Sequence, residues 1–479
     1  MSQTANPAAG GPPLTPDICV VGDAAGGVAV AMAAAVFGAG VVLVRRGDTA
    51  AGSPARRLAL RAVADRARLI ADGAAMGLPT SSGEIDYGTV HSHLEQMAAK
   101  AAIDASDERL TALGIRVLRG EPRFLNRQQI SVGPVLVKAR RFVIAAGATP
   151  AIPAIEGIED LPYLTEDGLY ALARRPERLI VLGGSPAAVE LAQAMRALGC
   201  EVDLVAPDGV LPGFDDEGVA MVRRGLVGDG VAIHEGRSVR RADRQRHRPR
   251  LILEDGTQLV GTHLLVASGE RPDIAQLDLD LAGVRSDAAG IVVDTALRTA
   301  NPRIYAIGAC AGGAGATMAQ DHAAQHQAGL IVRNALFRLP VRFRPEQMPR
   351  IVQGWPELAT IGLDEARARA SGAIRILRWP YADSARARAE RQVQGLVKVT
   401  TDRKGRILGV VIAGARAAEL IVPWQLAIQQ RLSVAEFARL APASQSLSEL
   451  SQKAALAFQA PLATKPGLRR LVGFLRRFG

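Results

Sequence analysis

Two stretches of the chain share one order of apolar and polar positions. Residues 17–46 contain an apolar run, a glycine-rich turn, an alanine-rich stretch with helical spacing and a second apolar run. Residues 178–207 repeat that order. An apolar run that leads through a glycine turn into a helix predicts a β–α–β unit, whose two strands are parallel. The sequence therefore predicts an α/β fold with two Rossmann-like nucleotide-binding domains.

The turn after the first strand of such a unit has three critical positions. In a dinucleotide-binding unit the first glycine permits the turn, the second lets the backbone approach a pyrophosphate, and the third lets the helix pack on the strand. These positions are Gly22, Ala24 and Gly27 in the first unit, and Gly183, Ser185 and Ala188 in the second. A side chain at the middle position stands where a pyrophosphate would come closest, so both turns are weakened as dinucleotide sites.

The acidic residue that usually ends the second strand is absent from both units. In dinucleotide-binding units this residue accepts hydrogen bonds from ribose hydroxyls. Arg45 occupies the position in the first unit and Ala206 in the second. Arginine suits a phosphate better than a ribose diol, so Arg45 indicates different chemistry there, or none. Ala206 leaves the choice between NADH and NADPH open.

Length and composition limit the class of protein. With 479 residues and 48% hydrophobic content, the chain is long and apolar enough for about three globular domains. The apolar runs are broken by turn residues and predict no membrane span. Residues 1–17 have neither the basic start nor the apolar core of a signal or transit peptide, so we expect a cytoplasmic protein.

The metal-binding residue types show no ligand spacing. Cys19, Cys200 and Cys310 are far apart and form no CxxC or zinc pattern. His91 and His93 are two residues apart, which places them on different faces of a helix. The sequence predicts neither a disulfide nor a metal site.

The net charge of +11 raises the question of anionic partners. Residues 240–250 are dense in arginine, but they lie between strand-like segments and are expected to form a charged hairpin loop. No aromatic residue is interleaved there, so the sequence gives no support for single-stranded nucleic acid binding. Residues 466–479 form a second basic patch that is expected to be a short amphipathic helix. We expect it to dock on the rest of the chain or on a partner subunit rather than on a membrane.

Further motifs follow the two glycine turns in a familiar order. They are "RVLRGEPRF" (116–124), "FVIAAGATPAIPAIEG" (142–157), "LLVASGERPDI" (264–274), "IVVDTALRTANPRIYAIGA" (291–309), "WPELATIGL" (355–363), "GRILGVVIAGARAAELI" (405–421) and "LSELSQKAA" (447–455). Through them the chain resembles the pyridine nucleotide-disulfide oxidoreductase family, closest in pattern to its dihydrolipoamide dehydrogenase and mercuric reductase branch. The resemblance covers residues 17–458.

The resemblance implies a domain order and a homodimer. An FAD-binding domain would comprise residues 1–150 and 268–340, with an NAD(P)-binding domain inserted at 151–267. A C-terminal α+β interface domain would follow at 341–465, before the basic amphipathic tail. The dinucleotide-contacting positions implied by the resemblance are Gly22, Ala24, Gly26, Gly27, Arg45, Arg56, Pro122, Ala146, Gly147, Ala148, Gly183, Gly184, Ala188, Glu190, Gly269, Arg271, Gly308 and Ala309.

Two polar anchors of the implied FAD site are altered. Arg45 replaces the ribose-binding acid, and Ala309 replaces the family's aspartate that holds the ribityl chain of the flavin. Each charge-assisted hydrogen bond is worth about 1.5–3 kcal/mol, so losing both predicts FAD binding weaker by about two to four orders of magnitude. Arg56 aligns with the family's lysine beside the reactive flavin nitrogen, and Glu190 aligns with the acid that pairs with that lysine.

The family's disulfide chemistry has no residues to carry it. In the family, two cysteines separated by four residues lie between a glycine pair and the next helix. Here "TAAG" (49–52) leads directly into "SPARRL" (53–58), as if the segment with both cysteines were deleted. Ser444 stands at the position of the family's histidine base, while Glu449, which follows it, is retained. The resemblance therefore predicts no catalytic residue for disulfide exchange.

Three hypotheses follow from the sequence. The first is an FAD- and NAD(P)H-dependent oxidoreductase that passes electrons from flavin directly to a small acceptor of unknown identity. The alternative is a redox-inactive pseudoenzyme that acts as a dimeric binding or regulatory scaffold. The third is a basic protein that binds nucleic acid or a membrane surface, which the sequence favours least.

Overall fold

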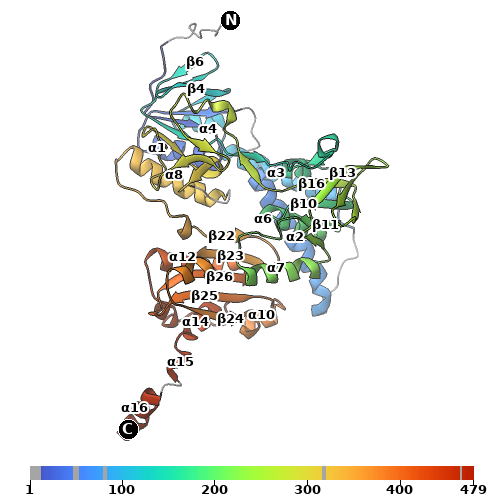
Figure 1. Ribbon diagram of the computed structural model, residues 1–479, viewed down its shortest axis with the longest axis vertical. Helices are drawn as coiled ribbons and strands as arrows, with labels where there is room; N and C mark the ends of the chain where they lie inside the picture. The colour runs from blue at the N-terminus through green and yellow to red at the C-terminus, as the bar shows by residue number, and fades with distance from the viewer. Residues whose placement is uncertain (1–11, 47–52, 79–83, 316–319, 464–465, 479) are drawn as a thin grey trace. The chain divides into compact units, whose positions relative to one another are not determined.

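The computed structural model describes residues 12–46, 53–78, 84–315, 320–463 and 466–478 (Figure 1). The sequence predicts that the family's cysteine segment is deleted between residues 52 and 53. This position borders residues 47–52, which lie outside the described part. The chain divides into two compact units. The first contains residues 1–154, 162–176 and 265–345, and the second contains residues 155–161, 177–264 and 346–479. The domain boundaries expected from the sequence stay predictions.

The first unit is built on a five-stranded parallel sheet. Its strand order is β20-β7-β1-β2-β3. The strands are β1 (Ile18–Val21), β2 (Val41–Arg45), β3 (Ile115–Arg119), β7 (Arg141–Ile144) and β20 (Ile304–Ala306). β1 lies between β7 and β2 and is completely buried, as its apolar run predicts. The first predicted β–α–β unit is confirmed.

Two helices of the first unit lie side by side, although they are far apart in the sequence (Figure 1). They are α1 (Ala25–Val36) and α8 (Asp321–Ala335). At Gly26 an added Cβ would lie 2.9 Å from Ile307 Cδ1 and 3.0 Å from Ala324 Cβ. Glycine at position 26 therefore lets the start of α1 approach the segment after β20 and the start of α8.

The second β–α–β unit is also confirmed. In a parallel arrangement, β10 (Arg178–Leu182) pairs with β11 (Glu201–Ala206), which pairs with β12 (Ala232–Glu235). Between β10 and β11 runs α6 (Pro186–Ala197), whose inner face is buried. β16 (His263–Val266) lies on the other side of β10.

The basic residues 240–250 lie in a β-hairpin, as expected, but most of them belong to its two strands and not to a long loop. β13 (Val239–Gln245) pairs antiparallel with β14 (Arg248–Leu253), and only two residues connect them. The burial alternates, because Ala242 and Leu251 face inward while most of the arginines are exposed. Most of the positive charges of this short sheet are therefore exposed to solvent.

The C-terminal part of the second unit is an antiparallel sheet with helices. Its order is β22-β23-β26-β25-β24, and its strands are β22 (Arg350–Val352), β23 (Glu357–Gly362), β24 (Ile374–Pro380), β25 (Leu396–Asp402) and β26 (Ile407–Gly414). In its core Trp424 of α12 (Val422–Gln429) stacks on Phe437 of α13 (Val434–Ala438), with ring centroids 3.7 Å apart. This α+β arrangement is the one expected for the interface domain.

The basic tail forms the predicted helix, α16 (Pro466–Leu475). Every residue from 466 to 478 is exposed. The prediction that the helix docks on the rest of its own chain was wrong, because an amphipathic pattern identifies an apolar face without showing what covers it. The other part of that expectation, docking on a partner subunit and not on a membrane, is not tested by a single chain. Among the described residues, no helix is both long and apolar enough to span a membrane.

Candidate functional site

The first glycine turn is shaped by close backbone contacts. Gly22 has a φ of +100°, and a Cβ there would lie 2.3 Å from the carbonyl oxygen of Ala145. A Cβ at Gly27 would lie 2.4 Å from the carbonyl oxygen of Gly22. Both distances are shorter than any tolerable contact, so the first and third positions of the turn require glycine.

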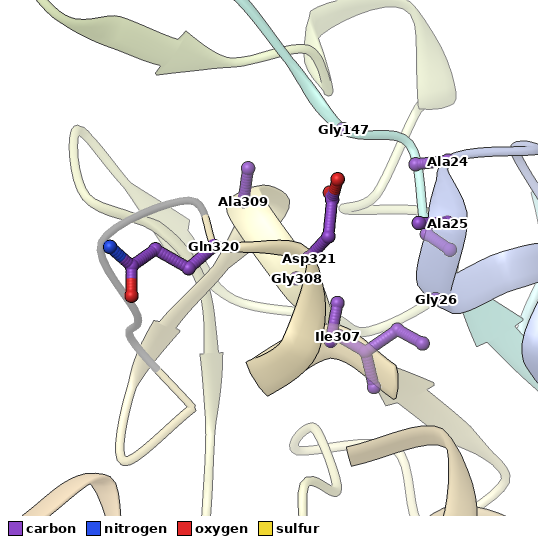
Figure 2. A pocket seen from close by; sticks show the side chains of 11 residues that line it. Ala24, Ala25, Gly26, Gly147, Ile307, Gly308, Ala309, Gln320 and Asp321 are labelled. Atoms are coloured by element: carbon purple, nitrogen blue, oxygen red, sulfur yellow. The ribbon is translucent and has the colours of Figure 1, made fainter. Parts of the chain in front are cut away.

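A cavity opens where this turn meets the starts of α1 and α8 (Figure 2). Its walls include Ala24 and Gly26 from the first turn, Gly147 from the segment after β7, and Gly308 and Ala309 from the segment after β20. The Cβ of Ala24 lines the cavity, as expected for a side chain at the middle position of the turn. The cavity thus brings together small residues that the sequence assigned to one FAD site.

The start of α1 suits an anion. Its N-cap residue, Ala24, makes no side-chain capping bond, and its first turn contains no acidic residue. The N-terminus of a helix presents backbone N–H groups and the positive end of the helix dipole. A pyrophosphate fits this wall of the cavity, because the donors, the dipole and the small lining residues all favour it.

The opposite wall carries a carboxylate that sequence reasoning missed. Asp321 is the first residue of α8 and lines the cavity near Ala309 (Figure 2). The two residues are 12 positions apart in the chain, and only the fold brings them to one cavity. The available signal was an acidic residue in the segment that follows Ala309, where the family's aspartate is replaced.

A buried glutamine holds the Ala309 side of the cavity in place. Gln327 of α8 is fully buried, and its Oε1 accepts a hydrogen bond of 2.8 Å from the Gly308 N–H. Its Nε2 donates a 3.0 Å bond to the carbonyl oxygen of Gly315. A polar residue on the buried face of an amphipathic helix was the signal that sequence reasoning overlooked.

Arg45 is bound by groups of the protein itself. Its side chain is 9% exposed, and its Nη1 donates a 2.5 Å hydrogen bond to Asp107 Oδ1. Its Nη2 donates to the carbonyl oxygen of Ala105, and its Nε lies 3.4 Å from Asp23 Oδ2. The guanidinium at the ribose position is therefore neutralised by two carboxylates before any ligand arrives.

Most of the other expected FAD positions lie on or next to a two-stranded antiparallel sheet. β8 (Ala148–Pro150) pairs antiparallel with β17 (Glu270–Pro272), which sets Arg271 opposite Thr149. The carbonyl oxygen of Gly269 accepts a 2.9 Å bond from the Ala151 N–H. Ala146 and Gly147 join β7 to β8, and Gly147 has a φ of +72°. Pro122 is buried at the start of β4 (Pro122–Asn126).

Arg56 and Glu190 each have a described partner. Arg56, on α2 (Ser53–Gly73), donates from Nε and Nη2 to the two carboxylate oxygens of Glu95 at 2.8 and 2.9 Å. Glu95 lies on α3 (Tyr87–Asp104), and this hydrogen bond lowers the pKa of its carboxyl. Glu190 Oε1 accepts a 2.8 Å bond from the Gln353 N–H. The pairing of Arg56 with Glu190 stays a prediction.

The second glycine turn offers fewer donors to an anion. Gly183 has a φ of +136°, and a Cβ at Gly184 would lie 1.9 Å from the carbonyl oxygen of Gly209. Ser185 caps α6, since its Oγ accepts a 3.2 Å bond from the Ala188 N–H. Pro186 follows and has no N–H. Of the first three helical positions, one has no N–H and another has its N–H bound by Ser185.

Known proteins match this chain over most of its length. Residues 16–328 match the pyridine nucleotide-disulphide oxidoreductase family, and residues 348–455 match the dimerisation domain of that family. The chain belongs to this family. Its members are flavoproteins that use FAD and pyridine nucleotides.

Relatives and solved structures agree with this assignment. The chain is 27% identical to a mercuric reductase of Lysinibacillus sphaericus over 92% of this chain and 82% of that protein. It is 31% identical to a dihydrolipoyl dehydrogenase of Thermus scotoductus over 71% of this chain and 75% of that protein. LpdA from Mycobacterium tuberculosis has a TM-score of 0.81 at 24% identity, covering 92% of this chain and 99% of its own. The Cu(II) complex of the HOCl-induced flavoprotein disulfide reductase RclA from Escherichia coli has a TM-score of 0.78 at 21% identity, with coverage of 92% and 99%. At these identities the structural likeness shows the fold alone.

Cys19, Cys200 and Cys310 of this family member are buried, and none of them forms a disulfide with another described residue. Burial raises the pKa of the Cys19 thiol, which lies within β1. Burial also raises the pKa of the Cys310 thiol to about 11, although backbone N–H groups of Ala146 and Gly147 act in the opposite direction. Nucleophilic cysteines react as thiolates, which a raised pKa disfavours.

Ser444, at the position of the family's histidine base, and Glu449, which follows it, show no arrangement of a catalytic pair. Ser444 is exposed. Glu449 Oε1 accepts a 2.8 Å hydrogen bond from the Gln445 N–H, so its carboxylate stabilises the turn before α14 (Glu449–Leu456). The retention of Glu449 thus has a structural explanation. Within the described ranges, no group of three His, Cys, Asp or Glu residues is arranged to hold a metal ion.

Proposed function

We propose that this chain is an FAD-dependent NAD(P)H oxidoreductase that reduces a small acceptor without a cysteine relay. FAD, when bound, supplies hydride acceptance from reduced nicotinamide and electron donation to an acceptor. The observation that carries the proposal is the cavity between the starts of α1 and α8. The uncapped start of α1 would hold the pyrophosphate, and the small residues at 147, 308 and 309 would leave room for the rest of the cofactor.

Direct transfer to the acceptor is favoured by the state of the cysteines. Disulfide exchange needs a thiolate that can reach the substrate. Cys19 and Cys310 are fully buried and their pKa values are raised, and Cys200 is also fully buried. No cysteine is left to relay electrons, and Ser444 cannot exchange a proton near neutral pH as histidine does.

The visible spectrum of the purified protein tests the proposal. Addition of FAD should produce a protein-bound flavin band, and anaerobic addition of NADH or NADPH should bleach it. A small disulfide substrate should not be reduced under the same conditions, which separates this reaction from disulfide exchange. A protein that binds FAD and is reduced by neither nucleotide would contradict the proposal.

The second candidate is a redox-inactive dimeric scaffold. One observation in its favour is that the charge of Arg45 is already neutralised by Asp107 and Asp23. Another is the second glycine turn, where Ser185 binds one backbone N–H of α6 and Pro186 has none, so that two donors are lost to a phosphate. If the protein is such a scaffold, light scattering should show a folded dimer, and the dimer should bind no flavin when excess FAD is added. The spectral titration therefore separates the two candidates.

Within the proposed site, Asp321 would supply the polar anchor that Ala309 lacks. Replacing Asp321 by alanine should weaken FAD binding by roughly 10- to 150-fold, the worth of one charge-assisted hydrogen bond to a hydroxyl. Repulsion between the carboxylate and the pyrophosphate should be the smaller effect, because Asp321 is exposed to solvent. Quenching of flavin fluorescence measures the dissociation constant.

Two further variants complete the Asp321 experiment. Asp280→Ala changes an exposed aspartate of the same unit that does not line the cavity, and it should leave FAD affinity unchanged. Asp321→Asn keeps an acceptor oxygen without the charge, so its affinity should lie between those of the parent and the alanine variant. Unchanged or tighter binding by Asp321→Ala would show that the carboxylate does not hold the cofactor.

A further inference from the structure

The C-terminal helix has an apolar face with no cover in the described chain. α16 (Pro466–Leu475) and the turn after it carry six exposed apolar side chains. Their exposed fractions are 42% for Leu468, 51% for Leu471, 44% for Val472, 54% for Phe474, 55% for Leu475 and 73% for Phe478. The rings of Phe474 and Phe478 contact each other edge to face, with centroids 4.9 Å apart. An exposed apolar patch of this kind marks an interaction surface.

The apolar and basic residues of this segment are separated around the helix. At about 100° per residue, the six apolar side chains fall within an arc of about 160°. Arg469, Arg470, Arg476 and Arg477 fall within an arc of about 120° on the other side. The helical hydrogen bonding continues to Arg476, whose N–H donates to the carbonyl oxygen of Val472 at 3.0 Å. Residues 466–479 contain no acidic residue.

This separation fits the boundary between water and lipid. Amphipathic helices with a basic polar face lie in the plane of a membrane surface, with their apolar side in the region between headgroups and acyl chains. Arginine side chains at the edge of the apolar face can extend to the phosphate groups while their methylenes stay in the apolar layer. A helix of ten residues is too short to span a bilayer, so a surface position is the one available to it.

The charge of the chain argues against a second copy as the occupant. The segment 466–478, with four arginines and no acid, gains attraction from a negatively charged partner. Another copy of this chain carries a net charge of +11, so it is a poor electrostatic match. Anionic lipids supply the missing negative charge and an apolar layer at one surface.

We propose that α16 binds the surface of anionic lipid membranes and attaches this protein to them. The apolar face would insert beneath the headgroups, and the arginines would contact lipid phosphates. One short helix gives weak attachment, but a dimer would present two copies and bind more tightly through avidity. This inference does not depend on FAD binding or on the proposed reaction.

Flotation of the full-length protein with lipid vesicles tests the proposal. Vesicles that contain phosphatidylglycerol should bind at least about tenfold more protein than vesicles of phosphatidylcholine alone, and added salt should reduce the difference. The double variant Leu471→Glu/Leu475→Glu should lose binding. Replacing all four arginines of the segment by glutamine should remove the preference for the anionic vesicles.

Matched variants control for general effects of charge. Leu281→Glu changes an equally exposed leucine of the other unit, and Arg240→Gln/Arg246→Gln changes exposed arginines of the β13–β14 hairpin. Both variants should bind vesicles as the parent does. Failure of the parent to bind anionic vesicles at low salt would overturn the proposal, as would loss of binding caused by the hairpin variant and not by the tail variants. Conversion of the dimer to a monomer by Leu471→Glu/Leu475→Glu, in the absence of lipid, would overturn it in favour of a partner subunit.

Discussion

Replacing Arg45 by glutamate, the type of residue that dinucleotide sites usually have there, should lower the free energy of unfolding by about 3–5 kcal/mol. The guanidinium is buried and is bonded to Asp107, with Asp23 close by. A glutamate would add a third carboxylate to this group and would leave the carbonyl oxygen of Ala105 without its donor. Urea unfolding of the flavin-free protein at neutral pH measures the change.

Arg119→Gln is the matched control for this experiment. Arg119 also pairs with Asp107, at 2.9 Å, but its side chain is 51% exposed. The loss of an exposed ion pair should cost no more than about 1 kcal/mol. The opposite outcome would be an Arg45→Glu variant that is as stable as the parent and binds FAD more tightly. It would show that residue 45 can still form hydrogen bonds with the ribose hydroxyls of FAD.

The fold was predictable wherever a local pattern determines it. The buried β1 and the glycine turn around Gly22 follow from an apolar run and from backbone conformations that only glycine adopts. The β13–β14 hairpin was expected, but its strands were mistaken for a loop because their high charge concealed the buried positions Ala242 and Leu251. For α16 the sequence predicted the helix but not its exposure, since the cover of an apolar face depends on the rest of the fold.

The polar contacts of the candidate site were not predictable in the same way. Arg45 and Asp107 are 62 residues apart, and nothing local to either residue indicates that they meet. Asp321 and Gln327 lie on one helix, but their roles depend on the segment around Gly308 and Ala309, which only the folded chain brings against them. The sequence could show which anchors were missing, while the structure shows which charges surround the vacated positions.

Replacing Lys398 by methionine should lower the free energy of unfolding by about 3–5 kcal/mol at neutral pH. Lys398 lies on β25 with a side chain that is only 4% exposed, and its Nζ lies 2.7 Å from Asp215, 2.7 Å from Glu217 and 3.0 Å from Glu365. Burial lowers the pKa of Lys398, but the hydrogen bonds to these three acids outweigh burial and raise it. Methionine matches the length of the side chain but leaves the carboxylates facing one another. Urea unfolding measures the difference from the parent, and Lys404→Met, at an exposed position, should change stability little.

The pH dependence identifies the cause of this effect. Glu217 is the second residue of α7 (Asp216–Gly228), and hydrogen bonds from Arg378 and then Lys398 lower its pKa to about 2. A carboxyl whose pKa is lowered by folding stabilises the folded state above its unfolded pKa of about 4.3, and this contribution is lost as the pH falls toward 2. The stability difference between the parent and Lys398→Met should therefore shrink from pH 7 to pH 3. Protonation makes the carboxyls neutral, so they no longer repel one another when the lysine charge is absent. A difference that stays constant over this range would mean that Lys398 stabilises the sheet through packing of its methylenes and not through its charge.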